Sequence, residues 1–129
     1  MKTTSIAQMV VRIAGLIQLI LGIIIWPGNT DLLIPVHILI GSLMVIAMLT
    51  LSYLAARSGI STGFIILAVV WALVLPAWGL TQEKMLPETG HWVIQILHLL
   101  CGIGAVGIAE MLGAQIRKKS ASTAHYSIP

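Results

Sequence analysis

The chain has 129 residues, of which 58% are hydrophobic and only 9% are charged, and its formal charge is +3. Soluble domains average about 25% charged residues, so this composition excludes a water-facing surface over most of the molecule. The basic pI near 9.4 does not indicate a nucleic-acid partner, because the basic residues stand at the ends of apolar runs and form no patch. A single cysteine, Cys101, excludes an intrachain disulfide and a cysteine-rich metal site.

Four long apolar runs predict an all-α integral membrane protein with four spans. Each run has roughly the 20 apolar residues that cross a hydrocarbon core of ~30 Å. The first run continues to Trp26 and Pro27 without a small-residue cleavage site, so we interpret it as a retained helix and not as a signal peptide. We expect one transmembrane domain over 1–119 and a polar, disordered tail over 120–129. The expected spans are about 8–27, 32–56, 62–80 and 91–116.

The charges predict how the bundle is oriented. Short connections favour an up-down-up-down arrangement of antiparallel neighbours. Under this topology, Lys84 lies on one side with Asp31, Glu83 and Glu88. The other side carries Lys2, Arg12, Arg57, Arg117, Lys118 and Lys119. The positive-inside rule then places both termini in the cytoplasm (N-in/C-in), in a bacterial inner membrane, with the lipid bilayer as the first partner.

Two histidines stand in matching strings. His37 and His98 each begin a histidine, three apolar residues and a glycine, over 37–41 and 98–102. At 1.5 Å per residue, the two side chains lie roughly 9 and 11 Å below the outer helix ends, so they share a depth. Diagonal helices of a square bundle are roughly 11–14 Å apart, which is too far for direct ring contact. Two axial imidazoles, each about 2 Å from an iron, would fill that gap, so His37 and His98 predict a bis-histidine haem b site. Histidines that only hydrogen-bond a neighbouring helix are the alternative.

Glycines accompany this pair of histidines. Gly41 and Gly102 lie one turn below His37 and His98 on the same faces. Without side chains there, a flat macrocycle could approach the backbone. On the first helix, Gly15 and Gly22 are seven residues apart and could form a matching flat wall.

Further polar residues follow the face of His98. His91 and Gln95 precede it at helical spacing on the same side of the fourth helix. Gln95 could orient a ligand ring or hold a haem propionate. His91 could meet a propionate or a quinone head group, or it could be an interfacial anchor beside Trp92.

Three further residues inside the spans could have a role. Glu110 is the one acid inside a span, and it could belong to a proton pathway or pair with Arg117 or Arg12. Gln18, midway along the first helix, is expected to pair with another helix. Trp71 could lie against a cofactor or fill the core.

Histidine on the second and fourth of four helices resembles the pattern of membrane b-type cytochrome bundles. It is also similar to one half of a haem A synthase, whose halves are four-helix bundles with histidine on the same two helices. The resemblance covers His37, His98 and the helix order. The synthases usually carry an acid one turn before a key histidine, where this chain has Leu33 and Ile94, which argues against synthase chemistry. The chain also resembles small bacterial four-span membrane proteins with an HxxxG second helix and an HWVIQxLH fourth helix, a resemblance that implies no activity.

These observations predict electron transfer. A single low-spin haem would relay electrons between a quinol and a partner on the outer face, in a subunit of a larger homo- or hetero-oligomeric redox complex. Bis-histidine ligation leaves no open iron position, so we expect no catalysis at the iron. The alternative is a cofactor-free accessory or assembly subunit. A small transporter is a weaker hypothesis, because the spans lack paired charges and unwound polar segments.

Overall fold

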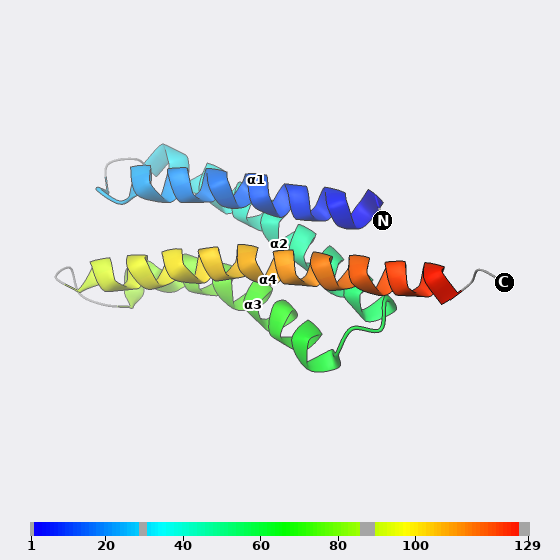
Figure 1. Cartoon of the computed structure of the whole chain (residues 1–129). Coiled ribbons are helices and arrows are strands. Elements are labelled where there is room, and N and C mark those ends of the chain that lie inside the picture. The colour runs from blue at the N-terminus through cyan, green and yellow to red at the C-terminus, as the bar shows by residue number, and fades with distance from the viewer. Residues whose placement is uncertain (1, 29–30, 86–89, 127–129) are drawn as a thin grey trace.

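The computed structural model describes residues 2–28, 31–85 and 90–126, where all regular structure is helical (Figure 1). Two short 3₁₀ helices, η1 (Asp31–Leu33) and η2 (Gln82–Lys84), precede α2 and follow α3. The four long helices are α1 (Lys2–Ile25), α2 (Ile34–Arg57), α3 (Thr62–Thr81) and α4 (His91–Tyr126).

All four long helices are long and apolar enough to cross a membrane, which confirms the predicted four-helix transmembrane bundle. α4 continues to Tyr126, past the expected end at residue 116 and into the segment expected to be a disordered tail. The hydroxyls of Ser120 and Ser122 donate hydrogen bonds to the carbonyls of Ile116 and Lys118 at 3.0 and 3.1 Å, so these polar side chains are satisfied within the helix. The last three residues of the tail, 127–129, lie outside the described residues.

The end of α2 is set by a local motif. Gly59 has a φ of +69°, which a residue without a side chain adopts at little cost. Its N–H donates to the carbonyl of Ala56, and the N–H of Ile60 donates to that of Ala55, at 3.2 and 3.1 Å. This Schellman motif satisfies the last carbonyls of the helix and turns Ile60 back into the core. At the other end of α2, Pro35 lies in the first turn, where its missing N–H costs little.

The helices pack as a rhombus. α1 and α3 each contact both α2 and α4, α2 and α4 contact each other, and the described parts of α1 and α3 do not meet. The core between them is rich in alanine, with Ala55, Ala68, Ala105 and Ala109 fully buried. Small side chains let helix backbones approach closely. One diagonal of the bundle is therefore short, which differs from the square cross-section expected from the sequence.

Tight packing is confined to one end of the bundle, which we call the terminal half because both chain ends lie there (Figure 1). Its fully buried side chains include Val11, Met48, Leu51 and Leu112. The opposite end, the histidine half, comprises residues 15–25, 34–43, 73–81 and 91–104. Ile94 is the one described residue of the histidine half that is classed as buried. The hydrophobic core thus closes the terminal half and leaves the histidine half more open.

The contact of α1 with α4 can be tested at Gly15. A Cβ added there would lie 2.8 Å from Cγ2 of Val106, and a β-branched valine cannot turn away freely. We expect Gly15→Ala to lower the midpoint of thermal unfolding in detergent, followed by circular dichroism, because overpacking costs about 1–3 kcal/mol.

Gly107→Ala is the matched control for this substitution. Gly107 is the next residue after Val106, and its added Cβ would meet nothing within 4 Å. We expect no loss of stability in this variant. Equal losses in both variants would contradict the close approach of the two helices at Gly15.

Candidate functional site

The structure brings His37 of α2 and His98 of α4 together. Their ring centres are 6.4 Å apart and the rings are tilted by 43°. Both side chains are half-buried. The expectation that diagonal helices hold the rings out of reach of each other was wrong, because the rhombic packing brings α2 against α4. The expectation that the two side chains lie at one depth agrees with this pairing.

Each histidine ring lies beside a glycine of a neighbouring helix. A Cβ on Gly22 of α1 would lie 4.0 Å from Cε1 of His37, and a Cβ on Gly79 of α3 would lie 3.0 Å from Cε1 of His98. A side chain at Gly79 would therefore displace the His98 ring. Of the expected glycine wall on α1, Gly22 reaches the site. Gly15 does not, because it packs on Val106 of α4.

The two glycines one turn below the histidines have different surroundings. A Cβ on Gly41 would lie 2.6 Å from Nε2 of Gln18. Gln18 of α1 therefore lies across Gly41 of α2, in keeping with the helix-pairing role expected for it. A Cβ on Gly102 would meet nothing within 4 Å, so the space predicted beside the macrocycle is open at Gly102 and occupied at Gly41.

Five buried polar atoms have no hydrogen-bond partner within the described part of the chain. They come from all four long helices and η2, and all lie in the histidine half or directly after it. Burying a polar atom without a partner costs free energy, and native structures contain few such atoms. Water, a bound ligand or a residue outside the described part of the chain would have to satisfy them. The five atoms are Gln18 Oε1, His37 Nδ1, Trp78 Nε1, Gln82 Oε1 and His98 Nδ1.

The number and type of ligating side chains limit which metal centre His37 and His98 could bind. Across the described residues, no group of three or more histidine, cysteine or acidic side chains could hold a metal ion. A structural metal site needs about four protein ligands. A haem iron already has four ring nitrogens and takes only axial ligands from the protein, so a pair of histidines matches what such a centre needs.

His91 and Gln95 are half-buried at the start of α4. The structure gives neither side chain a hydrogen bond to His37 or His98 among the described residues. Their expected contacts with a ligand ring, a propionate or a quinone stay predictions.

A small cavity opens on the α3 side of the pair. It measures about 60 Å³, has an apolar lining, and is lined by Trp71, Val74, Leu75, Trp78 and Cys101. The indole N–H of Trp71 donates to the Cys101 carbonyl at 2.9 Å, and Gly104 leaves room for its ring. Trp71 therefore joins α3 to α4. Neither histidine lines the cavity. Its nearest link to the pair runs through the chain, because Trp78 precedes Gly79, the residue that lies against the His98 ring.

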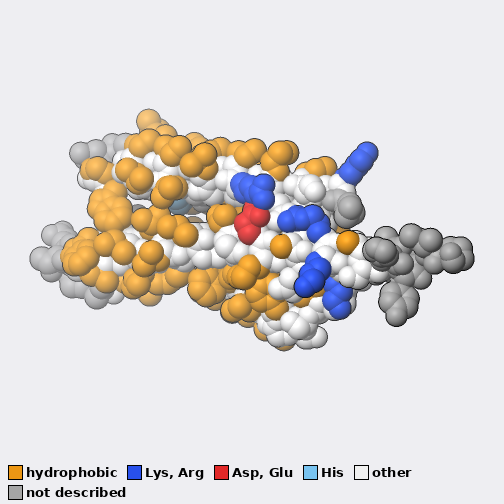
Figure 2. Space-filling view, in the orientation of Figure 1, with side chains coloured by type: hydrophobic (Ala, Val, Ile, Leu, Met, Phe, Trp, Pro, Cys, Tyr) orange, Lys and Arg blue, Asp and Glu red, His pale blue; other side chains and the backbone are white. Residues whose placement is uncertain are grey.

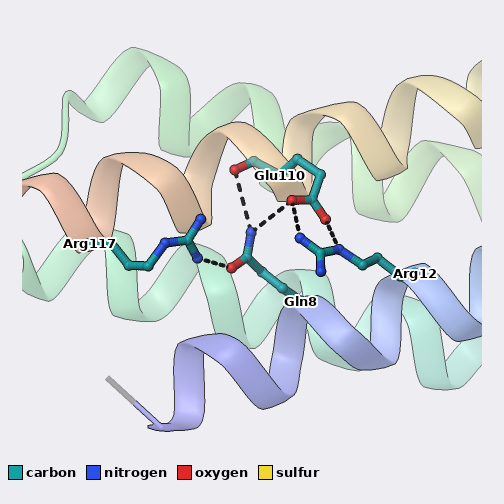
Figure 3. A network of polar contacts seen from close by, with 4 residues as sticks. All are labelled: Gln8, Arg12, Glu110 and Arg117. Atoms are coloured by element: carbon teal, nitrogen blue, oxygen red, sulfur yellow. Dashed lines mark hydrogen bonds and ion pairs between the residues drawn. The ribbon is translucent and has the colours of Figure 1, made fainter.

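A second polar cluster lies in the terminal half, which we call the polar seam (Figure 3). Arg12 of α1 forms a bidentate ion pair with Glu110 of α4, with contacts of 2.5 and 2.7 Å. Gln8 donates to the Glu110 carboxylate at 3.2 Å and accepts a hydrogen bond from Arg117. Pairing of Glu110 with Arg12 was one of the expected alternatives and is confirmed. Gln8 was not among the predicted residues, although its position four residues before Arg12 places both side chains on one face of the helix.

Comparison with known proteins does not assign a family. No protein-family model matches the sequence, and neither a curated protein nor a solved structure is significantly similar to the chain.

Proposed function

We propose that this protein is a membrane b-type haem protein that relays electrons, with His37 and His98 as the two axial ligands. The distance between the two rings carries the proposal. An imidazole nitrogen lies about 1.1 Å from its ring centre and about 2 Å from a bound metal, so one shared metal sets the ring centres about 6 Å apart. The observed 6.4 Å fits this value.

The surroundings of the pair also fit a haem. The histidine half contains little closed core, and the space beside Gly102 is open. An iron would take Nε2 of each histidine, so the buried Nδ1 atoms, which have no partner among the described residues, would still need a hydrogen-bond acceptor such as water. Haem b, when bound, supplies a one-electron couple. With both axial positions taken by histidine, the iron has no free position, so the proposal includes no catalytic activity.

The other residues would position the group. Gly102 would let a flat ring approach the α4 backbone, and Gly22 and Gly79 leave room for the two histidine rings. Gln95, on the His98 face of α4, would orient a ligand ring or bind a propionate. His91, nearer the helix end, would meet a propionate or a quinone head group. Gly41 would contribute indirectly, because it leaves room for the side chain of Gln18, which lies across it.

We further propose an alternating topology with both termini in the cytoplasm, in the inner membrane of a bacterium. The basic residues at the ends of the spans support this orientation under the positive-inside rule. It places His37 and His98 in the outer leaflet and the polar seam at the cytoplasmic side.

A quinol is the proposed electron donor, and the chain would be a small subunit of an oligomeric redox complex. The cavity beside Trp71 and Trp78 supports this choice, because it is apolar and the chain links it to the His98 region. The buried N–H of Trp78 has no acceptor among the described residues, and a quinone oxygen would supply one.

A cofactor-free accessory or assembly subunit is the second candidate. Two tilted rings at 6.4 Å can also pack against each other without a metal between them. In that case the histidines would hold α2 and α4 together, and the unpartnered nitrogens would bind water.

The haem proposal is tested by the spectrum of the protein purified in detergent from haem-replete cells. We expect a Soret band and an α-band in the reduced-minus-oxidised difference, and we expect both to vanish in His37→Ala and in His98→Ala. His91→Ala is the control, in which the spectrum should survive. A colourless wild-type protein would favour the accessory subunit, and loss of haem in His91→Ala would show that the ligand assignment is wrong.

The quinol site is tested with Trp78→Phe, which keeps an aromatic ring and removes the N–H. We expect the haem spectrum to be unchanged and the rate of haem reduction by a short-chain quinol to fall about fivefold, as for the loss of one hydrogen bond. Trp92→Phe, at an exposed tryptophan, is the control and should keep the wild-type rate. An unchanged rate in Trp78→Phe would exclude this cavity as the quinol site.

The topology is tested by cysteine labelling in spheroplasts with an impermeant maleimide, in a Cys101→Ser background. We expect Lys84→Cys, after α3, to react in intact spheroplasts. Ser61→Cys, in the loop before α3, should react only after lysis. The reverse pattern would place the termini outside.

A further inference from the structure

The polar seam carries more positive than negative charge. Arg12 and Arg117 are cations, and Glu110 is the one acid that contacts them among the described residues. The Glu110 carboxylate accepts hydrogen bonds from Nε and Nη2 of Arg12 and from the side-chain amide of Gln8. Among the described residues, the one hydrogen-bond partner of Arg117 is the neutral amide oxygen of Gln8, and Arg117 shares Glu110 with Arg12 through charge attraction without direct contact. One cationic charge of the seam is therefore not neutralised by an ion pair.

Gln8 lies buried between α1 and α4. Its side chain is 2% exposed, and it occupies the place that a side chain at position 113 of α4 would fill, so Gly113 makes room for it. The amide group of Gln8 donates to Glu110 on one side and accepts from Arg117 on the other (Figure 3). The two arginines are thus fixed on the same seam between α1 and α4.

Both arginines keep unused hydrogen-bond donors. Arg12 uses Nε and Nη2 on Glu110, so its Nη1 has no partner in the described chain. Arg117 uses one Nη1 hydrogen on Gln8, which leaves its other N–H groups without partners there. Both side chains are exposed. A guanidinium fork binds phosphate oxygens with planar, charge-assisted hydrogen bonds.

The surface around the seam is apolar and faces lipid. Met9, Ile13, Leu16 and Met111 are each half or more exposed on α1 and α4. Figure 2 shows one acidic group near the middle of this face with a basic side chain directly beside it, further basic side chains toward the terminal half, and apolar surface over the opposite half. An unneutralised cation is costly at such a surface, and it needs an anion that can reach it from the bilayer.

Helical rise sets the level of the seam along α4. Glu110, which pairs with Arg12, lies 19 positions after His91, about 29 Å along the α4 axis, close to the thickness of a hydrocarbon core of about 30 Å. Arg117 lies 26 positions after His91, about 39 Å along the same axis, which is beyond such a core. Arg117 is therefore the member of the seam that reaches the headgroup region.

We propose that the polar seam binds the phosphate of one anionic phospholipid, whose headgroup lies against Arg117 and whose acyl chains follow the exposed apolar residues of α1 and α4. The free donors of Arg117 hold the phosphate, and Arg12 with Glu110 closes the lower end of the site. Lys118, next to Arg117 and exposed, adds to the attraction for an anionic lipid. This site does not depend on the presence of haem.

The test is native mass spectrometry of the full chain released from detergent with equal amounts of phosphatidylglycerol and phosphatidylcholine. We expect the wild-type protein to retain one phosphatidylglycerol in preference to phosphatidylcholine. Arg117→Gln should reduce this preference about fivefold, the expected effect of one arginine near an anionic surface. If Arg117→Gln does not fold, Arg117→Lys keeps the charge and removes the planar fork, and it should show a smaller loss.

Arg57→Gln is the matched control, because it makes the same charge change at the end of α2, where the arginine contacts only Tyr53. This variant should keep the wild-type preference. Equal losses in Arg57→Gln and Arg117→Gln would overturn the proposal in favour of diffuse attraction. Equal retention of both lipids, or displacement of phosphatidylglycerol by inorganic phosphate at low concentration, would also overturn it.

Discussion

A polar side chain inside a bilayer must find a partner in the protein or take one from outside, and this constraint divides the molecule in two. In the terminal half, Gln8, Arg12 and Glu110 pair with one another across α1 and α4, and Arg117 keeps the free donors that we propose for a lipid phosphate. In the histidine half, buried atoms of His37 and His98 have no partner in the described chain. Since lipid offers no hydrogen bonds, the first half is held together by its polar contacts and the second half is suited to a ligand.

Residues without large side chains decide where the helices approach. Alanines such as Ala105 and Ala109 are fully buried between the helices, and Gly104 and Gly113 make room for Trp71 and Gln8. Because small residues let backbones come close, α2 meets α4 along a short diagonal. The proposed haem ligands come within reach of one metal for this reason.

The two proposed sites lie at opposite ends of the bundle and use different chemistry. The histidine pair offers two imidazole rings in a half with little closed core. The polar seam offers arginine donors at a lipid-facing surface. Helix α4 contributes to both sites. His98 lies on its N-terminal half, and Glu110 and Arg117 lie on its C-terminal half. A lipid bound at the seam would therefore hold the C-terminal half of the helix that carries one proposed ligand.

The sequence by itself determined the four spans and the chemical nature of the candidate residues, because hydropathy and charge act locally along the chain. It also predicted that His37 and His98 share a depth, since helical rise depends only on residue number. Only the tertiary structure decided the 6.4 Å between their rings, the contact of Gln18 with Gly41 and the role of Gln8. These depend on which helices contact each other and how closely, and that is set by side-chain packing between segments far apart in the chain.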